Sequence, residues 1–214
     1  MFTRTIARRA ALAGVTIVAA LALSACGDTD HSTSGPGHDK PGMGASTAAS
    51  AGASASFGQA DVMFAQMMIP HHQQAVQMAE LADTRAADPE VKKLAGQIKA
   101  AQAPEIATMT GWLTAWGMPA PSAGAGHGTS MPGMDHGMPG MMSDADMARL
   151  AAASGTGFDK QFLTMMIAHH EGAITMAKDE VARGVNPDAK ALAQQIMTAQ
   201  QGEIDTMNKI LDRL

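Results

Sequence analysis

Phe64-Ala-Gln-Met-Met-Ile-Pro-His-His72 and Phe162-Leu-Thr-Met-Met-Ile-Ala-His-His170 are the two stretches that decide the fold of this chain. They lie 98 residues apart, and the match extends without a gap over residues 61–113 and 159–211. Of the 53 aligned pairs, 24 are identical. The chain therefore contains an internal duplication, and both repeats are expected to fold in the same way.

Each repeat has the pattern of a helical hairpin. Apolar residues recur at i, i+3, i+4 and i+7, which predicts a first helix over residues 61–86 and, in the second repeat, over 159–183. Asp88-Pro89 and Asn186-Pro187 follow these segments. A capping residue before a proline is typical of a helix start, so each repeat is expected to contain a second helix. Strand patterns are absent from the sequence.

Two hairpins with one apolar face each must bury these faces against one another. The sequence therefore predicts an all-α fold over residues 59–214, a four-helix bundle made of two duplicated helical hairpins. An approximate two-fold axis is expected between the halves. Ser143, Asp144 and Asp146 predict a short additional helix ahead of the second hairpin.

The N-terminal residues predict export and lipidation. Three arginines lie within the first nine residues, and an apolar run over 10–23 follows them and leads into Leu23-Ser-Ala-Cys26. This is the pattern of a bacterial lipoprotein signal peptide over residues 1–25, with Cys26 as the lipidated residue. The apolar run is shorter than a membrane-spanning helix.

Residues 26–58 are rich in Gly, Ser, Thr and Ala and predict a flexible tether. Cys26 is the only cysteine, so no disulfide within the chain is expected. The expected location is the extracytoplasmic face of the cell membrane, to which the lipid on Cys26 anchors the protein.

Composition narrows the class of partner. The formal charge of −5 includes three arginines of the signal peptide, so the mature chain carries about −8, which argues against nucleic acid as a partner. Methionine is unusually frequent, with 19 in 214 residues. Thioether sulfur is a soft ligand that suits Cu(I), but methionine is also a flexible core residue. The count alone leaves both interpretations open.

The placement of histidine and glutamate favours metal binding. Three methionines lie within about 60° of His71 on its helix, and His72 lies on the shoulder of this face, toward a neighbouring helix. A glutamate interrupts the apolar stripe of the second helix, which is costly unless the carboxylate is paired or coordinates an ion. Both repeats have this arrangement. The candidate metal ligands are Met67, Met68, His71, His72, Met78, Glu105 and Met109 in the first repeat and Met165, Met166, His169, His170, Met176, Glu203 and Met207 in the second.

Copper is the expected metal. Di-iron helical bundles use Glu-x-x-His, whereas this chain has Met68-Ile-Pro-His71 and Met166-Ile-Ala-His169, with a thioether in place of the carboxylate. This exchange favours copper, Cu(I) above Cu(II). Two roles remain open for Glu105 and its equivalent: ligands to Cu(II), or acceptors that orient the imidazoles.

A second candidate copper site lies in the segment over residues 119–142, between the repeats. Methionine and histidine occur there among glycine and proline, where no core residue is expected. A flexible segment of this composition suits capture of Cu(I) by exchangeable ligands. Its candidate ligands are His127, Met131, Met134, His136, Met138, Met141 and Met142.

Met-Met-Ile-Pro-His-His-x-x-Ala-x-x-Met, from Met67, and Gln-x-x-Glu-Ile-x-x-Met, from Gln102, resemble the family known as domain of unknown function 305. The resemblance covers about residues 60–214. It implies a ferritin-like four-helix bundle in exported bacterial proteins, some of them periplasmic copper binders linked to copper resistance. Carried over by position, it points to Met68, His71, His72, Met78 and their equivalents in the second repeat. The segment over 119–142 is not part of this pattern.

The function expected from these features is a non-enzymatic lipoprotein that binds copper through Met and His ligands. Such a protein would sequester copper, confer tolerance, or exchange copper with a donor or acceptor protein. Two alternatives remain: a ferritin-like metallo-oxidase that acts on Cu(I), and a structural helical module with an adaptable methionine core.

Overall fold

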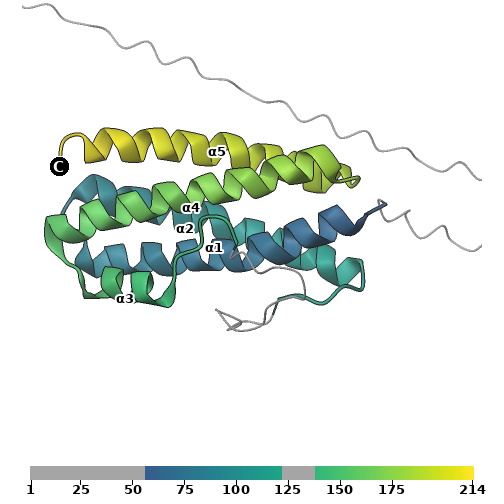
Figure 1. The fold of residues 1–214 in the computed structure, drawn as a ribbon, viewed down its shortest axis with the longest axis horizontal. Coiled ribbons are helices and arrows are strands. Elements are labelled where there is room, and N and C mark those ends of the chain that lie inside the picture. Colours follow the sequence, from purple (N-terminus) through teal and green to yellow (C-terminus); the bar gives the residue numbers. More distant parts are fainter. Residues whose placement is uncertain (1–55, 122–137) are drawn as a thin grey trace, which may run out of the picture. The chain divides into compact units, whose positions relative to one another are not determined.

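The computed structural model describes residues 56–121 and 138–214, and within them the chain forms helices and no strand (Figure 1). Cys26 and most of the predicted tether lie outside the described residues, as do four candidate ligands of the segment between the repeats, His127, Met131, Met134 and His136. The helices are α1 (Gln59–Arg85), α2 (Pro89–Ala115), α3 (Asp144–Ala152), α4 (Gly155–Arg183) and α5 (Pro187–Leu211).

Side-chain caps begin three of these helices. The carboxylate of Asp88 accepts the backbone N–H groups of Glu90 and Val91, and Asn186 occupies the same position ahead of α5. Ser143 and Asp146 form a reciprocal capping box at the start of α3. These bonds satisfy N–H groups that have no partner within the helix. They confirm the two predicted second helices and the predicted short helix.

Helix α4 begins at Gly155, four residues before the predicted start at 159. The additional turn places Phe158 in the core, where its ring stacks on Phe162 at a centroid distance of 5.7 Å. Burial of a whole aromatic side chain stabilises this turn, which the periodicity of the repeat does not include.

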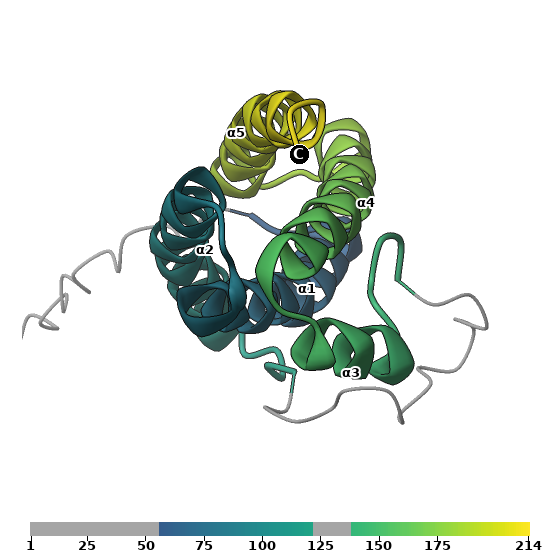
Figure 2. The same ribbon diagram turned by 90° about the vertical axis from the view of Figure 1, so that its left-hand side faces the viewer.

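The five helices form a four-helix bundle with one helix outside it. Figure 2 shows α1, α2, α5 and α4 around the bundle axis, with α3 packed outside against α1 and α4. Helices α1 and α4 lie antiparallel, and α2 ends at the opposite end of the bundle from the start of α4 (Figure 1). A long crossover therefore joins the two hairpins, as in ferritin-like folds. None of the described helices combines the length and apolarity that crossing a membrane requires.

Two buried aspartates join the halves at opposite ends of the bundle. Asp61, at the start of α1, accepts the N–H groups of Val185 and Asn186 at 3.1 and 2.8 Å. Asp159, at the start of α4, accepts those of Ala87 and Asp88 at 3.1 and 3.0 Å. Since the two sets are equivalent in the repeats, the halves pack with the expected two-fold relation.

Candidate metal centre

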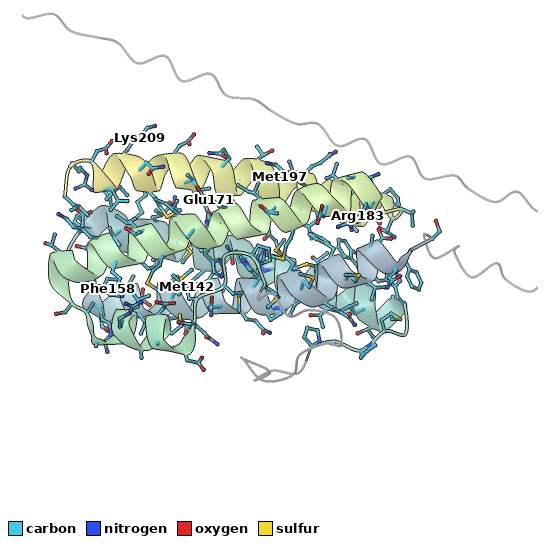
Figure 3. All side chains as sticks on the ribbon, in the orientation of Figure 1. Met142, Phe158, Glu171, Arg183, Met197 and Lys209 are labelled. Carbon is cyan, nitrogen blue, oxygen red and sulfur yellow. The ribbon has the colours of Figure 1, made fainter. Side chains whose placement is uncertain are left out.

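The centre of the bundle contains a pair of histidines in direct contact. His71 lies near the middle of α1 and His169 near the middle of α4, and their ring centroids are 3.7 Å apart. Both side chains are buried. Because they are equivalent in the two repeats, the two-fold axis passes between them. Figure 3 shows side-chain nitrogens gathered at mid-length in the bundle, with sulfur atoms to either side.

The other two histidines bind glutamates of the second helices. His72 Nε2 lies 2.7 Å from Glu105 Oε2, and His170 Nε2 lies 2.6 Å from Glu203 Oε2. Both imidazoles are fully buried, while the glutamate side chains are about one-fifth exposed, at 20% and 19%. His72 thus contacts a neighbouring helix, as its position on the helix predicted. In this structure both carboxylates are hydrogen-bond acceptors for the imidazoles.

All four histidines, His71, His72, His169 and His170, have a ring nitrogen without a hydrogen-bond partner. Carbonyl and carboxylate oxygens only accept hydrogen bonds, so Nε2 of His72 and of His170 carries the proton that is donated to glutamate. Nε2 of His71 carries a proton for the same reason, because it donates to Pro139 O at 3.0 Å. In the neutral ring, Nδ1 then has a free lone pair. Nδ1 of all three residues is buried without a partner, and neither nitrogen of His169 makes a hydrogen bond of ordinary geometry. Metal-binding histidines have this arrangement, with one nitrogen held and the other free.

The central pair is uncharged at neutral pH. Burial, followed by the neighbouring His72, lowers the pKa of His71 to about 3. Burial and then His71 hold the pKa of His169 well below its ordinary value. Neutral imidazole is the form that coordinates a metal, so no proton has to leave these rings when an ion binds.

Buried methionines form two groups, one in each core cluster. The first methionine group contains two residues of the first repeat and one of the second, and the second methionine group has the reverse composition. Met67 and Met165 are partly buried beside the first and second group, respectively. The first group is Met68, Met109 and Met176, and the second is Met78, Met166 and Met207.

The donors that the bundle interior brings together are therefore imidazole nitrogens and thioether sulfurs. Among the described residues, no group of three or more His, Cys, Asp or Glu side chains is placed to hold a metal ion by itself. Two buried glutamines, Gln102 and Gln200, also have side-chain amide atoms without a partner. Gln102 and Gln200 are equivalent in the two repeats, and this identity was the signal in the sequence that pointed to them.

Residues 138–142, here called the strap, lie against α1 and α4 beside the central histidine pair. Gln74 donates to Met142 O at 2.9 Å and accepts from Met142 N–H at 2.7 Å. Gly140, at φ 77°, approaches α4 so closely that a Cβ there would lie 2.6 Å from Ala168 O. A Cβ on Gly172 would lie 2.0 Å from Pro139 O.

The strap was not predicted. Gln74 and Gly172, which both contact the strap, occupy equivalent positions in the two repeats but are different residues. This difference between the repeats was the signal in the sequence for a contact of the strap. Met138, Met141 and Met142 are partly buried, and Met142 packs against the core. The expectation that no core residue is needed in this segment was therefore wrong for Met142, because the strap contacts the bundle.

A family model described as "Domain of unknown function (DUF305)" matches residues 61–211. The chain belongs to the DUF305 family. Other DUF305 proteins have the same fold. A putative secreted DUF305 protein from Streptomyces coelicolor is 38% identical, with a TM-score of 0.64, and the match covers 72% of this chain and 93% of that one. A DUF305 fragment from Deinococcus radiodurans is 34% identical, also with a TM-score of 0.64, over 74% of this chain and 99% of that one.

CopM is a similar protein that has been solved in metal-bound forms. Its Cu(I)-bound form is 33% identical to this DUF305 chain, with a TM-score of 0.58, over 72% of this chain and 96% of CopM. CopM has also been solved in Cu(II)-bound and Ag-bound forms. The chain is also 54% identical over 54 residues to the uncharacterized protein L153 of Acanthamoeba polyphaga mimivirus. This match spans only 36% of L153.

Proposed function

We propose that this protein binds copper, chiefly as Cu(I), at the centre of its helical bundle. The observation that carries this proposal is the set of buried imidazoles with partnerless Nδ1 atoms. A buried polar atom without a partner is costly, and natural proteins retain few of them. The methionine groups of both core clusters add thioether ligands next to this set.

The donor chemistry favours copper over iron, manganese or calcium. Thioether and neutral imidazole are soft to borderline ligands that suit Cu(I), whereas the harder ions prefer carboxylate oxygen. Glu105 and Glu203 act through the imidazoles as acceptors that fix ring orientation and tautomer. The copper-bound and silver-bound forms of CopM support this assignment, since Ag(I) shares the charge and softness of Cu(I).

The protein sequesters copper or hands it on at the extracytoplasmic face of the cell membrane. Cys26 carries the lipid anchor, and the residues before it are removed as a signal peptide. The name of the Streptomyces relative, a putative secreted protein, supports the location. Binding and release constitute the whole activity, so no catalytic residue is assigned. A copper-donor or copper-acceptor protein is the expected partner.

The test is an anaerobic titration of the full-length protein with Cu(I) against a competing chelator. The bundle variant is His71→Leu with His169→Leu, and the matched control, His127→Ala with His136→Ala, removes two histidines of the segment between the repeats. We expect tight binding in the wild type and the control and its loss in the bundle variant. With free Cu(I) at about 100 times Kd, binding stabilises the fold by about 2.7 kcal/mol and raises Tm by roughly 5–10 °C.

Other outcomes would change the assignment. Loss of binding in the control alone would move the site to the segment over 119–142. No tight binding in the wild type would end the copper proposal and leave a helical interaction module. Catalytic oxygen consumption with Cu(I) would make the protein an oxidase.

A further inference from the structure

The two ends of the bundle differ in polarity. Among the described residues, every large apolar side chain that is exposed lies within four residues of a helix terminus at one end, where α1 begins, α2 ends and α4 turns into α5 (Figure 1, right). These side chains are Phe57, Met63, Met118 and Val185, which are between 37% and 56% exposed. At the other end, Arg213 forms ion pairs with Asp88 and Glu90.

Apolar side chains from three connections gather at the first of these ends. The ring of Phe57, ahead of α1, stacks on that of Trp116 at a centroid distance of 4.8 Å. A Cβ on Gly58 would lie 3.3 Å from Cγ2 of Val185, so Val185 lies against the backbone next to Phe57. Met118 follows Trp116 in the turn after α2. Phe57, Trp116, Met118 and Val185 are here called the end patch.

The segments that carry the end patch contain no charged residue. They are residues 56–60, 115–121 and 184–187, whereas 16% of the whole chain is charged. Because a charged group loses free energy when it leaves water, a surface without charges is covered at lower cost. Exposed apolar surface of this kind marks contact with a protein or a membrane.

The size of this end argues against a freely diffusing protein as the partner. A helix with its side chains is about 10 Å wide, so the end of a four-helix bundle covers roughly 400 Å². A stable protein–protein interface needs about 800 Å² on each partner. A contact of this size is therefore weak, and it forms only with a surface that is already held nearby.

The chain itself holds one surface nearby. The described residues begin at Ser56, whose carbonyl oxygen accepts from Asn186 Nδ2 at 3.3 Å, so the preceding segment joins the bundle at this end. Phe57 follows Cys26 by 31 residues. A segment of this length reaches at most about 110 Å, so a lipid on Cys26 makes contact between bundle and bilayer intramolecular. A weak contact is then sufficient.

We propose that the end patch rests on the headgroup region of the membrane to which Cys26 anchors the protein. The inference rests on the lipid anchor of the proposed function. Tryptophan and other aromatic side chains are favoured at the boundary between headgroups and acyl chains. The bundle stands end-on, with the charged end at Arg213 away from the bilayer. Because the patch has no charge, the contact does not require anionic lipid.

Tryptophan fluorescence reports on this end alone. The chain has two tryptophans, Trp112 in the last turn of α2 and Trp116 directly after it. The full-length lipidated protein is incorporated, without metal, into phosphatidylcholine vesicles in which some lipids carry bromine near the headgroup, where it quenches tryptophan. We expect quenching relative to vesicles without bromine, and the same quenching at high salt, because no ion pair contributes.

Two variants remove the contact and keep both tryptophans. Phe57→Ser with Val185→Ser should weaken it at least about tenfold, because two exposed apolar side chains are lost. Met118→Glu should have a similar effect, since its carboxylate resists leaving water. Leu214→Ser, at the opposite end of the bundle, is the matched control and should be quenched like the wild type. Circular dichroism melting curves check that each variant is folded.

Flotation and copper binding separate this inference from the proposed function. If the wild type floats with the vesicles but is not quenched, or if the patch variants are quenched equally, the end patch is wrong and the proposed function stands. If the wild type does not float, the lipid anchor and the end patch both fail, while the Cu(I) titration still judges the copper site. An emission blue shift that grows with protein concentration without vesicles would make the patch an interface between copies and overturn the membrane contact.

Discussion

At the residue scale, the properties of the proposed metal centre depend on which ring nitrogen of each histidine makes a hydrogen bond. Glu105 and Glu203 hold Nε2 of the two outer imidazoles, which leaves Nδ1 free inside the bundle. A carboxylate that accepts from a ligating histidine fixes the tautomer and raises the basicity of the free nitrogen. In the proposed site, each glutamate thus acts on the bound ion through its histidine.

Replacing both glutamates should weaken copper binding without loss of the fold. In Glu105→Gln with Glu203→Gln, the amides keep the shape of the side chains but lose the charge-assisted bond. We expect the Kd for Cu(I) to rise about 10–100-fold, measured by anaerobic competition with a chelator. Glu171→Gln, at an exposed position of α4, is the control. An unchanged Kd in the double variant would show that these carboxylates do not support the ligands.

Glu180 should make the metal-free protein less stable at alkaline pH. Burial and then the neighbouring Asp61 raise the pKa of Glu180 from 4.5 to about 8. Because the folded-state pKa exceeds the unfolded one, this contribution to stability is complete below pH 4.5 and is lost as pH rises through 8.

The free energy of unfolding should fall by at most about 1.4 kcal/mol per pH unit because of Glu180, and Glu180→Gln should remove this dependence. Urea unfolding at about pH 5 and about pH 8 measures the effect. Asp179→Asn, one residue away and exposed, should keep the slope of the wild type. A Glu180→Gln protein with the same pH dependence as the wild type would contradict the prediction.

At the element scale, the strap distinguishes the two otherwise equivalent hairpins. It packs where α4 has Gly172, and its far end binds Gln74 on α1. A side chain at residue 172 would occupy the position of Pro139 O. The contact between the strap and His71 therefore depends on a glycine in a different helix.

Gly172→Ala should displace the strap from α4 and remove its hydrogen bond to His71. We expect the protein to lose about 1–3 kcal/mol of stability, because the backbone of the strap must move. Gly202→Ala, in α5, is the matched control, since a Cβ there meets no atom within 4 Å. The control should gain about 0.5–1 kcal/mol from the higher helix propensity of alanine. Equal shifts in urea midpoint for both variants would contradict this prediction.

At the scale of the whole molecule, two hairpins with a common sequence pattern pack about an approximate two-fold axis. Asp61 and Asp159 join the halves at opposite ends of the bundle, and the central histidine pair lies on the axis. The environments of the two aspartates differ in one respect. Glu180 lies beside Asp61, whereas the residue equivalent to Glu180 in the first repeat is Ala82, which has no charge.

Asp159→Asn should cost more stability than Asp61→Asn at alkaline pH. Each substitution weakens bonds to buried backbone N–H groups, with an expected cost of about 1–3 kcal/mol. Asp61→Asn also removes a negative charge beside Glu180, which offsets part of this cost. Urea unfolding of the two variants at about pH 8 gives the comparison. A larger loss in Asp61→Asn would show that its proximity to Glu180 does not destabilise the fold.

Helix positions and their inward faces could be predicted from the sequence because they depend on local periodicity and on the duplication. The starts of α2, α3 and α5 followed from Asp88, Ser143 and Asn186, whose side chains act within one turn of the chain. The direction of His72 followed from its helical angle. The comparison of the repeats also identified the helix faces that carry the imidazoles and thioethers, although Met67 and Met165 are only partly buried.

Contacts between helices were decided by the tertiary structure alone. The packing of α1 against α4 decides three features of the site. They are the contact of His71 with His169, the mixed composition of each methionine group, and the position of the strap. Helical periodicity specifies the face that a residue occupies but not its partner across an interface. The two repeats are identical at 24 of the 53 aligned pairs, and Met63 and Glu180, which line one cleft, stand at positions where the repeats differ. Such differences acquire a chemical role only when the packed bundle brings them together.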